Sequence, residues 1–323
     1  MAQTFEALQN YKSVTKEQLT TAVENAVSII KGNLTYFTGH FQSPNTYHGF
    51  YEQTENVEWT TGFWTGEIWL AYEFTKDPAL IKAAEIQVRS FLHRIEEKID
   101  VNYNDMGFLF SLSCVAANKI CGNEEGKRAA LLAADHLASR YRETGEFLQA
   151  WGNVGDKDNY RLIIDCLLNL PLLYWATEVN YAQIDVKHME TAMKCILRKD
   201  HSTYHTYFIN PETGEPAYGV THQGNRHNSA WARGQAWGIY GVALSCRYRK
   251  KESYLEIFRS VTDYFLEHLP QDLIPYWDFD FDTGSLEPRD SSAAAIAVCG
   301  IYEMADYLEK EEAEKYCMAA DNI

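Results

Sequence analysis

Two kinds of helical segment alternate along this chain, and the alternation limits the folds that it can adopt. Segments of the first kind are charged on one face and apolar on the other, and they lie near residues 16–37, 78–97, 124–142, 182–199, 252–268 and 311–320. Segments of the second kind are rich in Gly, Ala, Ser, Cys and aromatic residues and poor in charge, and they lie near residues 61–75, 105–120, 161–177, 230–248 and 290–307. Helices that are apolar on every side must be enclosed by other helices. The alternation therefore predicts an all-α protein built of helical hairpins in two concentric rings, an α/α barrel or toroid.

The two kinds of segment are not equal in number. A six-hairpin (α/α)6 barrel needs twelve helices, whereas the sequence provides six charged outer segments and five apolar inner ones. We therefore expect the last inner helix to be missing at the C-terminus. The longest irregular stretch, residues 200–230, contains the turn-rich segment Asn210–Pro216 and predicts a short β-hairpin. No linker rich in Pro, Ser or Gly divides the chain, so we expect residues 1–323 to form one domain.

Charge and hydropathy exclude several classes of partner. The net charge of -16 argues against nucleic acid and anionic membranes, because affinity for phosphate depends on clustered Lys and Arg. Residues 1–10 lack the charged and apolar regions of a secretory signal, and no stretch approaches the roughly 18 consecutive apolar residues that cross a bilayer. The 7 cysteines form an odd set without a Cys-x-x-Cys pair. We expect a cytoplasmic protein with free thiols and no zinc site.

Asp165 lies within the apolar segment 161–177, where a carboxyl group is unusual. On a helix, Arg161, Asp165 and Asn169 would form one narrow polar stripe. Burial of a lone carboxylate costs several kcal/mol or raises its pKa, and such groups gather at catalytic sites. The alternative is an ion pair between Arg161 and Asp165 that holds two helices together. The segment by itself favours neither interpretation.

Acids and an arginine stand at the beginnings of the apolar segments, which would line the mouth of a central funnel. Asp105 can be an ordinary N-cap, and that position would keep its carboxylate ionised while Asp165 is pushed toward the neutral acid. Such a divergence in pKa separates the roles of acid and stabiliser. Arg233 lies on an apolar segment and needs an anion, which can be an internal carboxylate or the carboxylate of a uronic acid.

Tryptophans cluster at the same helix beginnings. They are Trp59, Trp64, Trp151, Trp231 and Trp237. A tryptophan in an enclosed helix commonly packs in the core, but the clustering favours an aromatic cleft. Flat aromatic faces stack on the C–H faces of sugar rings, so a pair of carboxyl groups inside such a cleft indicates a carbohydrate ligand.

Four stretches of the sequence resemble the unsaturated glucuronyl hydrolases, glycoside hydrolase family 88. They are Val57-Glu-Trp-Thr-Thr-Gly-Phe-Trp-Thr-Gly-Glu67, Asn104-Asp-Met-Gly-Phe108, Arg161-Leu-Ile-Ile-Asp-Cys-Leu-Leu-Asn-Leu-Pro-Leu-Leu173 and Ser229-Ala-Trp-Ala-Arg-Gly-Gln-Ala-Trp237. The matches are in order and span nearly all of the chain. The resemblance implies a six-hairpin α/α barrel that acts on oligosaccharides left by polysaccharide lyases, whose non-reducing uronic acid carries a C4=C5 double bond. It implies no metal and no organic cofactor.

The resemblance also implies roles for individual residues. Asp165 takes the place of the main acid/base, and Asp105 takes the place of the second carboxylate. The positions that hold substrate are Trp59, Trp151, His205, Gly219, Thr221, Gln223, Arg233 and Trp237. Members of the family continue past the point where this chain ends, with a segment that contributes to the rim of the site and to sulfate preference.

The double bond and the ring oxygen of such a substrate form a vinyl ether, which a neutral Asp165 can protonate at C4. A related alternative is an unsaturated rhamnogalacturonyl hydrolase, although the run Ile163–Leu167 favours the glucuronyl enzymes. A second alternative is a conventional inverting glycosidase on the same toroid, in which two carboxyl groups flank the glycosidic bond. A third is a noncatalytic sugar-binding toroid, which has no need of an isolated carboxyl group in an apolar helix.

Overall fold

The computed structural model describes residues 14–176 and 181–323. Residues 1–10, from which no secretory signal was expected, and Thr177, at the expected end of an inner segment, lie outside the described residues. The α-helices are α2 (Lys16–Phe37), α3 (Thr61–Thr75), α4 (Pro78–Glu96), α5 (Met106–Phe110), α6 (Ala116–Cys121), α7 (Glu124–Ser139), α8 (Leu170–Trp175), α9 (Ala182–Ile196), α10 (Ala232–Arg249), α11 (Glu252–Glu267), α12 (Ser291–Ala305) and α13 (Lys310–Ala320). Within the described residues, no helix is both long enough and apolar enough to span a membrane.

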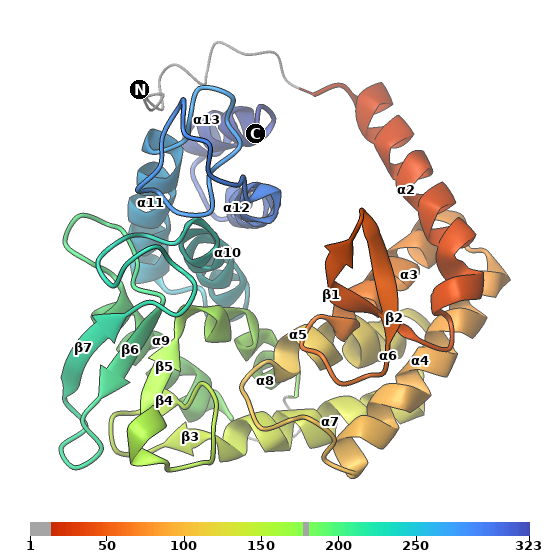
Figure 1. Cartoon of the computed structure of the whole chain (residues 1–323), viewed down its shortest axis with the longest axis horizontal. Helices are drawn as coiled ribbons and strands as arrows, with labels where there is room; N and C mark the ends of the chain where they lie inside the picture. The colour runs from red at the N-terminus through yellow and green to blue at the C-terminus, as the bar shows by residue number, and fades with distance from the viewer. Residues whose placement is uncertain (1–13, 177–180) are drawn as a thin grey trace.

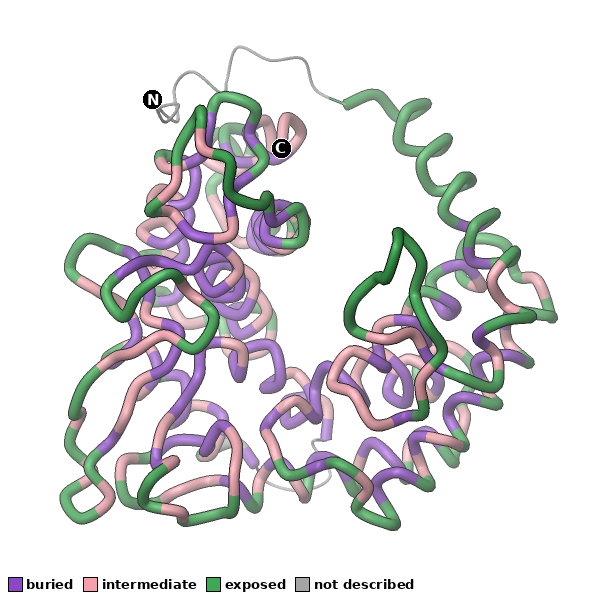
Figure 2. The backbone as a smooth tube through the Cα atoms, in the orientation of Figure 1, coloured by how far each residue is buried: buried purple, intermediate pink, exposed green. Residues whose placement is uncertain are grey.

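The helices form an incomplete ring with an inner and an outer layer (Figure 1). Helices α3, α5, α6, α8, α10 and α12 belong to the inner layer, and α2, α4, α7, α9, α11 and α13 to the outer layer. Helix α2 lies on one side of the opening in the ring, and α12 and α13 lie on the other. The inner helix α10 is buried along most of its length, whereas α2 buries only Val27, Ile30 and Phe37 (Figure 2). The alternating segments therefore predicted the layering correctly.

Capping residues fix where several outer helices begin. Thr15 forms a capping box with Gln18: its Oγ1 accepts a hydrogen bond from the backbone N of Gln18 at 3.2 Å, and Gln18 Oε1 accepts from the backbone N of Thr15 at 2.8 Å. Asp77 caps α4, which starts with a proline at its first position. Asn123 caps α7 by accepting from the backbone N of Gly126 at 2.8 Å. These caps satisfy amides that have no partner within the helix.

Glycines lie where neighbouring inner segments meet. An added Cβ would come within 3.0 Å of the adjacent segment at each of four positions: Gly62 against Phe108, Gly107 against Asn169, Gly241 against Leu167 and Gly300 against Tyr240. Glycine allows two backbones to approach more closely than any other residue. The inner layer is therefore held together at these four contacts by backbone packed directly against its neighbour.

The segment 161–177 is not one helix, so the prediction for it was wrong. Arg161–Ile163 form strand β5, Ile164–Leu168 form a 3₁₀-helix (η3), and α8 begins only at Leu170. The strand pairs with β6, and Pro171 occupies the start of α8 because proline fits the first turn of a helix and not its interior. Arg161 and Asp165 therefore do not share a helix face. The inner segment 105–120 is also divided, since a π-helix (η1, Ser111–Val115) separates α5 from α6.

In the part of the chain that the structure describes, three small antiparallel sheets accompany the helices, and an all-α description leaves them out. The strands are β1 (Phe41–Tyr47), β2 (Phe50–Thr54), β3 (Tyr141–Arg142), β4 (Phe147–Leu148), β5 (Arg161–Ile163), β6 (Thr206–Ile209) and β7 (Pro216–Val220). The sheets are β1-β2, β3-β4 and β5-β6-β7. The hairpin predicted within residues 200–230 is confirmed as β6-β7, and Asn210 closes its turn by donating its backbone N–H to Glu215 O at 2.9 Å. A 3₁₀ turn (η2, Lys157–Asn159) precedes β5.

Candidate active site

A cavity of about 320 Å³ opens where the inner segments begin. It is lined by Trp59, Asn104, Asp105, Trp151, Ile163, Asp165, His205, His222, Gln223, Trp231, Arg233 and Trp237. These residues come from parts of the chain more than a hundred residues apart, and the curvature of the helical ring brings them together. Eight of the ten candidate site residues predicted from the sequence lie in this wall.

Asp165 stands in the first turn of η3 with its carboxyl group at the cavity. Its side chain is 17% exposed, and its Oδ1 atom has no hydrogen-bond partner among the described residues. Burial, together with the negative charge of Asp105, raises the pKa of this carboxyl to about 8, although the positive charge of Arg233 opposes the rise. No ion pair joins Arg161 to Asp165 in the described structure. Asp165 is therefore largely a neutral acid at pH 7, with an oxygen free to meet a ligand.

His205 stands beside Asp165 in a fixed tautomer. Its Nδ1 accepts hydrogen bonds from the backbone N–H groups of His222 at 3.0 Å and Gln223 at 3.1 Å. Because Nδ1 accepts, the ring proton sits on Nε2, which lies 3.9 Å from Asp165 Oδ1. Burial, helped by neighbouring positive charges, lowers the pKa of His205 to about 3. The histidine is thus a neutral hydrogen-bond donor at the cavity.

Asp105 occupies the N-cap position of α5, as predicted, but its side chain makes no capping bond. Its Oδ1 accepts instead from Asn104 Nδ2 at 3.3 Å and from Asn169 Nδ2 at 3.4 Å. Burial raises its pKa, the Asn169 hydrogen bond and the charge of Arg140 oppose the rise, and the result is a pKa of about 7. The expectation that capping would keep Asp105 fully ionised was wrong, because the carboxyl turns from the helix amides toward the cavity. The pKa of Asp105 nevertheless stays below that of Asp165.

Asn169 connects the segments that carry the two carboxyl groups. It is completely buried, and its Oδ1 accepts from the backbone N of Phe108 at 3.0 Å. Its Nδ2 donates to Asp105 Oδ1 and, at 3.2 Å, to the backbone carbonyl of Asp165. A single amide therefore uses both its acceptor and its donor to fix the relative positions of the two acids.

Arg140 is a second buried group behind Asp105. Its guanidinium donates to the backbone carbonyls of Gln149 at 2.9 Å and Gly152 at 3.1 Å, and to Asn102 Oδ1 at 3.2 Å. These bonds hold the loop that presents Trp151. The charge of this guanidinium also favours the ionised form of Asp105.

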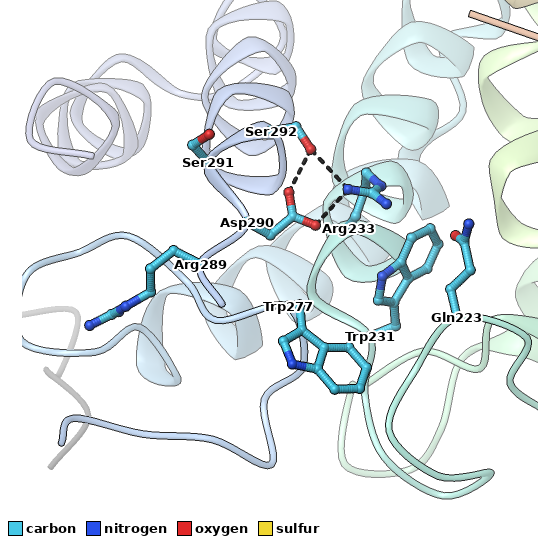
Figure 3. Close-up of a pocket in the computed structure, with 8 residues that line it drawn as sticks. All are labelled: Gln223, Trp231, Arg233, Trp277, Arg289, Asp290, Ser291 and Ser292. Atoms are coloured by element: carbon cyan, nitrogen blue, oxygen red, sulfur yellow. Dashed lines mark hydrogen bonds and ion pairs between the residues drawn. The ribbon is translucent and has the colours of Figure 1, made fainter. Parts of the chain in front are cut away.

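Arg233 has an internal carboxylate as its anion. Its Nη1 donates to Asp290 Oδ2 at 2.7 Å and to Ser292 Oγ at 3.1 Å (Figure 3). Its guanidinium also lies 4.8 Å from the centre of the Trp231 ring. Asp290 in turn caps α12 by accepting from the backbone N of Ala293 at 3.0 Å. Of the two anions considered for Arg233, the structure provides the internal one and holds Nη1 beside the cavity.

Tryptophans form much of the remaining wall. Trp59 and Trp237 both contact Phe108, with ring centres 5.6 and 5.1 Å away. Trp151 contacts both His222, whose ring centre lies 5.4 Å away, and the guanidinium of Arg161, which lies 4.3 Å from the indole centre. Trp64, which the clustering had placed with these residues, is a core residue only 2% exposed, and its Nε1 donates to the backbone carbonyl of Phe37.

Gly219 and Thr221 are not brought to the cavity wall. Gly219 lies in β7, where an added Cβ would come 2.4 Å from the ring of Tyr204. Thr221 uses its Oγ1 to accept from the backbone N of Gly224 at 2.6 Å, which shapes the loop that follows β7. Both residues therefore lie next to the loop that carries His222 and Gln223, and neither lines the cavity.

Four lining residues were not predicted as site residues, namely Asn104, Ile163, His222 and Trp231. Three of them stand in polar or aromatic helix beginnings that the sequence marks, whereas Ile163 carries no signal beyond its place before Asp165. Among the described residues, no group of three or more His, Cys, Asp or Glu side chains is arranged to hold a metal ion. The carboxyl groups, the histidine and the arginine that line this cavity can transfer protons and stabilise charge.

An acid that holds its proton at neutral pH, a second carboxyl group linked to it and tryptophan walls on a helical toroid define a glycoside hydrolase. The model of Glycosyl Hydrolase Family 88 matches residues 29–317, and the chain belongs to that family. The family resemblance found in the sequence is therefore confirmed.

Similar proteins include the unsaturated chondroitin disaccharide hydrolase of Streptococcus pneumoniae, 46% identical over 94% of this chain and 77% of the relative. The crystal structure of unsaturated glucuronyl hydrolase from Streptococcus agalactiae superposes with a TM-score of 0.95 at 44% identity, covering 99% of this chain and 83% of that chain. A mutant of the latter enzyme complexed with dGlcA-GalNAc6S has a TM-score of 0.85 at 40% identity, covering 99% and 82% of the two chains. This chain is a glycoside hydrolase of the unsaturated glucuronyl hydrolase type.

Proposed function

We propose that this enzyme acts on unsaturated uronyl oligosaccharides, hydrating the C4=C5 double bond of the non-reducing uronic acid and thereby releasing it. The observation that carries the proposal is the carboxyl group of Asp165, which has a pKa of about 8, an oxygen without a partner and a place in an aromatic cavity. A conventional glycosidase needs a proton donor at the glycosidic oxygen, but a vinyl ether needs one at carbon. The relatives named above, with their unsaturated substrates, support the second chemistry.

In the first step Asp165 gives its proton to C4, and the electron pair of the double bond forms the new C4–H bond. Positive charge then develops at C5 and on the ring oxygen. Asp105 in its ionised form stabilises that charge, which is the reason that its pKa must stay below that of Asp165. The neutral Nε2–H of His205 lies 3.9 Å from Asp165 Oδ1, and its dipole favours the carboxylate that this step creates.

In the second step Asp165, now a carboxylate, takes a proton from water as the water oxygen bonds to C5. The product is a hemiketal at C5, which opens and lets the remaining sugar leave. The anomeric carbon is never displaced directly, so this chemistry needs no acid at the glycosidic oxygen.

We propose that Trp59, Trp151 and Trp237 pack on the faces of the uronyl ring, and that His205, Gln223 and Arg233 bind its oxygens. All six line the cavity. Gly219 and Thr221 act through the loop between β7 and α10, whose backbone positions His222 and Gln223. Arg233 keeps a positive charge near the cavity, which suits an anionic uronate even though Asp290 already binds Nη1.

We also propose that the ring is the six-hairpin barrel of the family, formed as one domain. Among the described residues, six helices fill the outer positions of such a barrel. Five of its six inner positions are filled, by α3, α5-α6, η3-α8, α10 and α12. The position between α2 and α12 is the one without a described inner helix.

The reaction can be followed with an unsaturated chondroitin disaccharide in D₂O. Loss of the alkene absorbance should be accompanied by deuterium at C4, seen by NMR, because Asp165 exchanges its proton with solvent. The Asp165→Asn variant should bind the disaccharide but lose turnover by about a thousandfold or more, since an amide cannot deliver the proton.

Asp263→Asn serves as the matched control. Asp263 is a half-buried carboxyl on the outer helix α11 whose pKa burial also raises, and it is not part of the cavity. This variant should retain full activity. Turnover of Asp165→Asn at the rate of the unmodified enzyme would refute the assignment of the acid. Cleavage of a saturated glucuronide without deuterium at C4 would instead favour the inverting glycosidase.

A further inference from the structure

Arg161, the first residue of β5, contacts the wall of the cavity without lining the cavity itself. Its guanidinium lies 4.3 Å from the centre of the Trp151 indole and 4.8 Å from the centre of the Phe208 ring. Phe208 stands directly opposite Arg161 in the pairing of β5 with β6, which lie side by side (Figure 1). A guanidinium is attracted to the faces of aromatic rings. Two rings and a paired strand therefore fix the position of this cation.

No carboxylate among the described residues pairs with Arg161. Its Nη2 donates to the amide oxygen of Asn159 at 3.1 Å, and its Nε is buried without a partner in the described structure. Burial lowers the pKa of the guanidinium, and no described Asp or Glu opposes that change. An arginine nevertheless stays charged in a folded protein. Arg161 thus carries a positive charge that no described acid offsets.

The cavity has another arginine, but its charge is matched. Arg233 forms an ion pair with Asp290 at 2.7 Å, which offsets much of its charge. Arg161 has no such partner, and its field reaches the cavity, since its positive charge is one of the causes that lower the pKa of His205. The chain as a whole carries a net charge of -16, which repels anions at long range. An unmatched cation beside the cavity therefore changes the local potential that an anionic ligand meets.

We propose that Arg161 is a specificity-determining residue for an anionic sugar. Its charge, held in place by Trp151 and Phe208, attracts the uronyl carboxylate into the cavity without contacting it. The proposal rests on the proposed function, because it requires a substrate that carries this carboxylate. It also explains why a residue so close to Asp165 in the sequence forms no ion pair with it: the charge of Arg161 is left available to act on the ligand.

The substitutions Arg161→Lys and Arg161→Gln separate the charge of this residue from its packing. Lysine keeps the positive charge but loses the planar group that packs on the rings, whereas glutamine loses the charge. With an unsaturated uronyl disaccharide at low salt, Arg161→Gln should lower kcat/KM about fivefold and leave kcat within about twofold, because the charge acts on capture of the substrate. Arg161→Lys should stay within about twofold of the unmodified enzyme in both quantities.

Ionic strength provides a second measurement, which a packing defect would not alter. At about 1 M salt the Debye length is roughly 3 Å, so the difference in kcat/KM between the unmodified enzyme and Arg161→Gln should narrow to less than about twofold. Arg259→Gln is the control. Arg259 lies on the outer helix α11 and pairs with Glu312 through bonds of 2.6 and 2.9 Å, so its replacement changes the net charge equally but away from the cavity. This control should leave kcat/KM nearly unchanged at both salt concentrations.

Three results would overturn the proposal. They are equal losses in the lysine and glutamine variants, a loss in Arg161→Gln that is the same at low and high salt, and no loss in Arg161→Gln. In the first two cases Arg161 would act through packing alone. Circular dichroism of both variants checks that they fold. Failure of the unmodified protein to turn over the disaccharide would instead overturn the proposed function, so the two failures are distinguishable.

Discussion

Replacing Asn169 with leucine should move the acidic side of the profile of kcat/KM against pH to higher pH and leave the alkaline side in place. The proposed reaction needs Asp105 ionised and Asp165 protonated. We therefore expect kcat/KM to rise as pH passes the pKa of Asp105, about 7, and to fall as pH passes the pKa of Asp165, about 8. Leucine has nearly the size of asparagine but cannot donate to Asp105 Oδ1. The lost bond is long, 3.4 Å, so we assign it the lower end of the range for a hydrogen bond to a charged group, about 1.5 kcal/mol.

That free energy raises the pKa of Asp105 by about one pH unit, to the value of Asp165. At pH 7 the fraction of enzyme in the active protonation state then falls from about one half to about one tenth, so kcat/KM should drop about fivefold. At pH 9 the fraction is about one tenth in both proteins, because protonation of Asp165 limits it, and the rates should converge.

The assay is kcat/KM against pH from 5 to 10, measured through the alkene absorbance. Gln87→Leu is the control, since Gln87 is another buried amide, bonded to Thr65 and to the carbonyl of Phe37 away from the cavity. Both variants should lower the free energy of unfolding, but only Asn169→Leu should move the acidic side of the kcat/KM profile. A loss that is the same at every pH would refute the idea that Asn169 acts through the charge of Asp105.

Two further substitutions test the packing and the charge around the site. Gly62→Ala puts a Cβ 2.2 Å from the carbonyl oxygen of Phe108 and should cost about 3 kcal/mol or more of stability in thermal denaturation. Gly39→Ala, which meets nothing within 4 Å, should leave the melting temperature nearly unchanged; comparable melting temperatures for the two would contradict the close contact. Asp290→Asn keeps a cap for α12 but leaves Arg233 without a carboxylate. The freed positive charge should lower the pKa of Asp165 and move the alkaline limb of kcat/KM to lower pH. If the alkaline side of the profile does not move, the charge of Arg233 does not affect the pKa of Asp165.

The alternating helical segments predicted the layering, and the turn-rich segment Asn210–Pro216 predicted the β6-β7 hairpin, because each depends on local composition. The pattern failed at residues 161–163. Two apolar residues after an arginine fit a strand as well as a helix, and the choice depends on pairing with Phe208 and its neighbours, some 45 residues later. The position of Pro171, now the start of α8, was the local sign that the helix begins late.

The two carboxyl groups were also predictable, since an acid in an apolar segment stands out. Their supporting groups were not. Arg140 and Asp290 reach Asp105 and Arg233 from segments far away in the chain, and neither has an unusual local context. Asn169 was visible as part of a supposed helical stripe, but its actual partners depend on the fold. Such groups are set by three-dimensional neighbours, which periodicity does not encode.

The glycine contacts between inner segments have a consequence for how specificity can vary. Because each of these contacts leaves no room for even a methyl group, a side chain added at any of them would push neighbouring inner segments apart. The loop that carries Gln223 lies outside these contacts, so it can change while the spacing of the acids stays constant. The acids and the selectivity loop therefore lie in separate parts of the chain, so the loop can diverge in sequence while the positions of the acids are preserved.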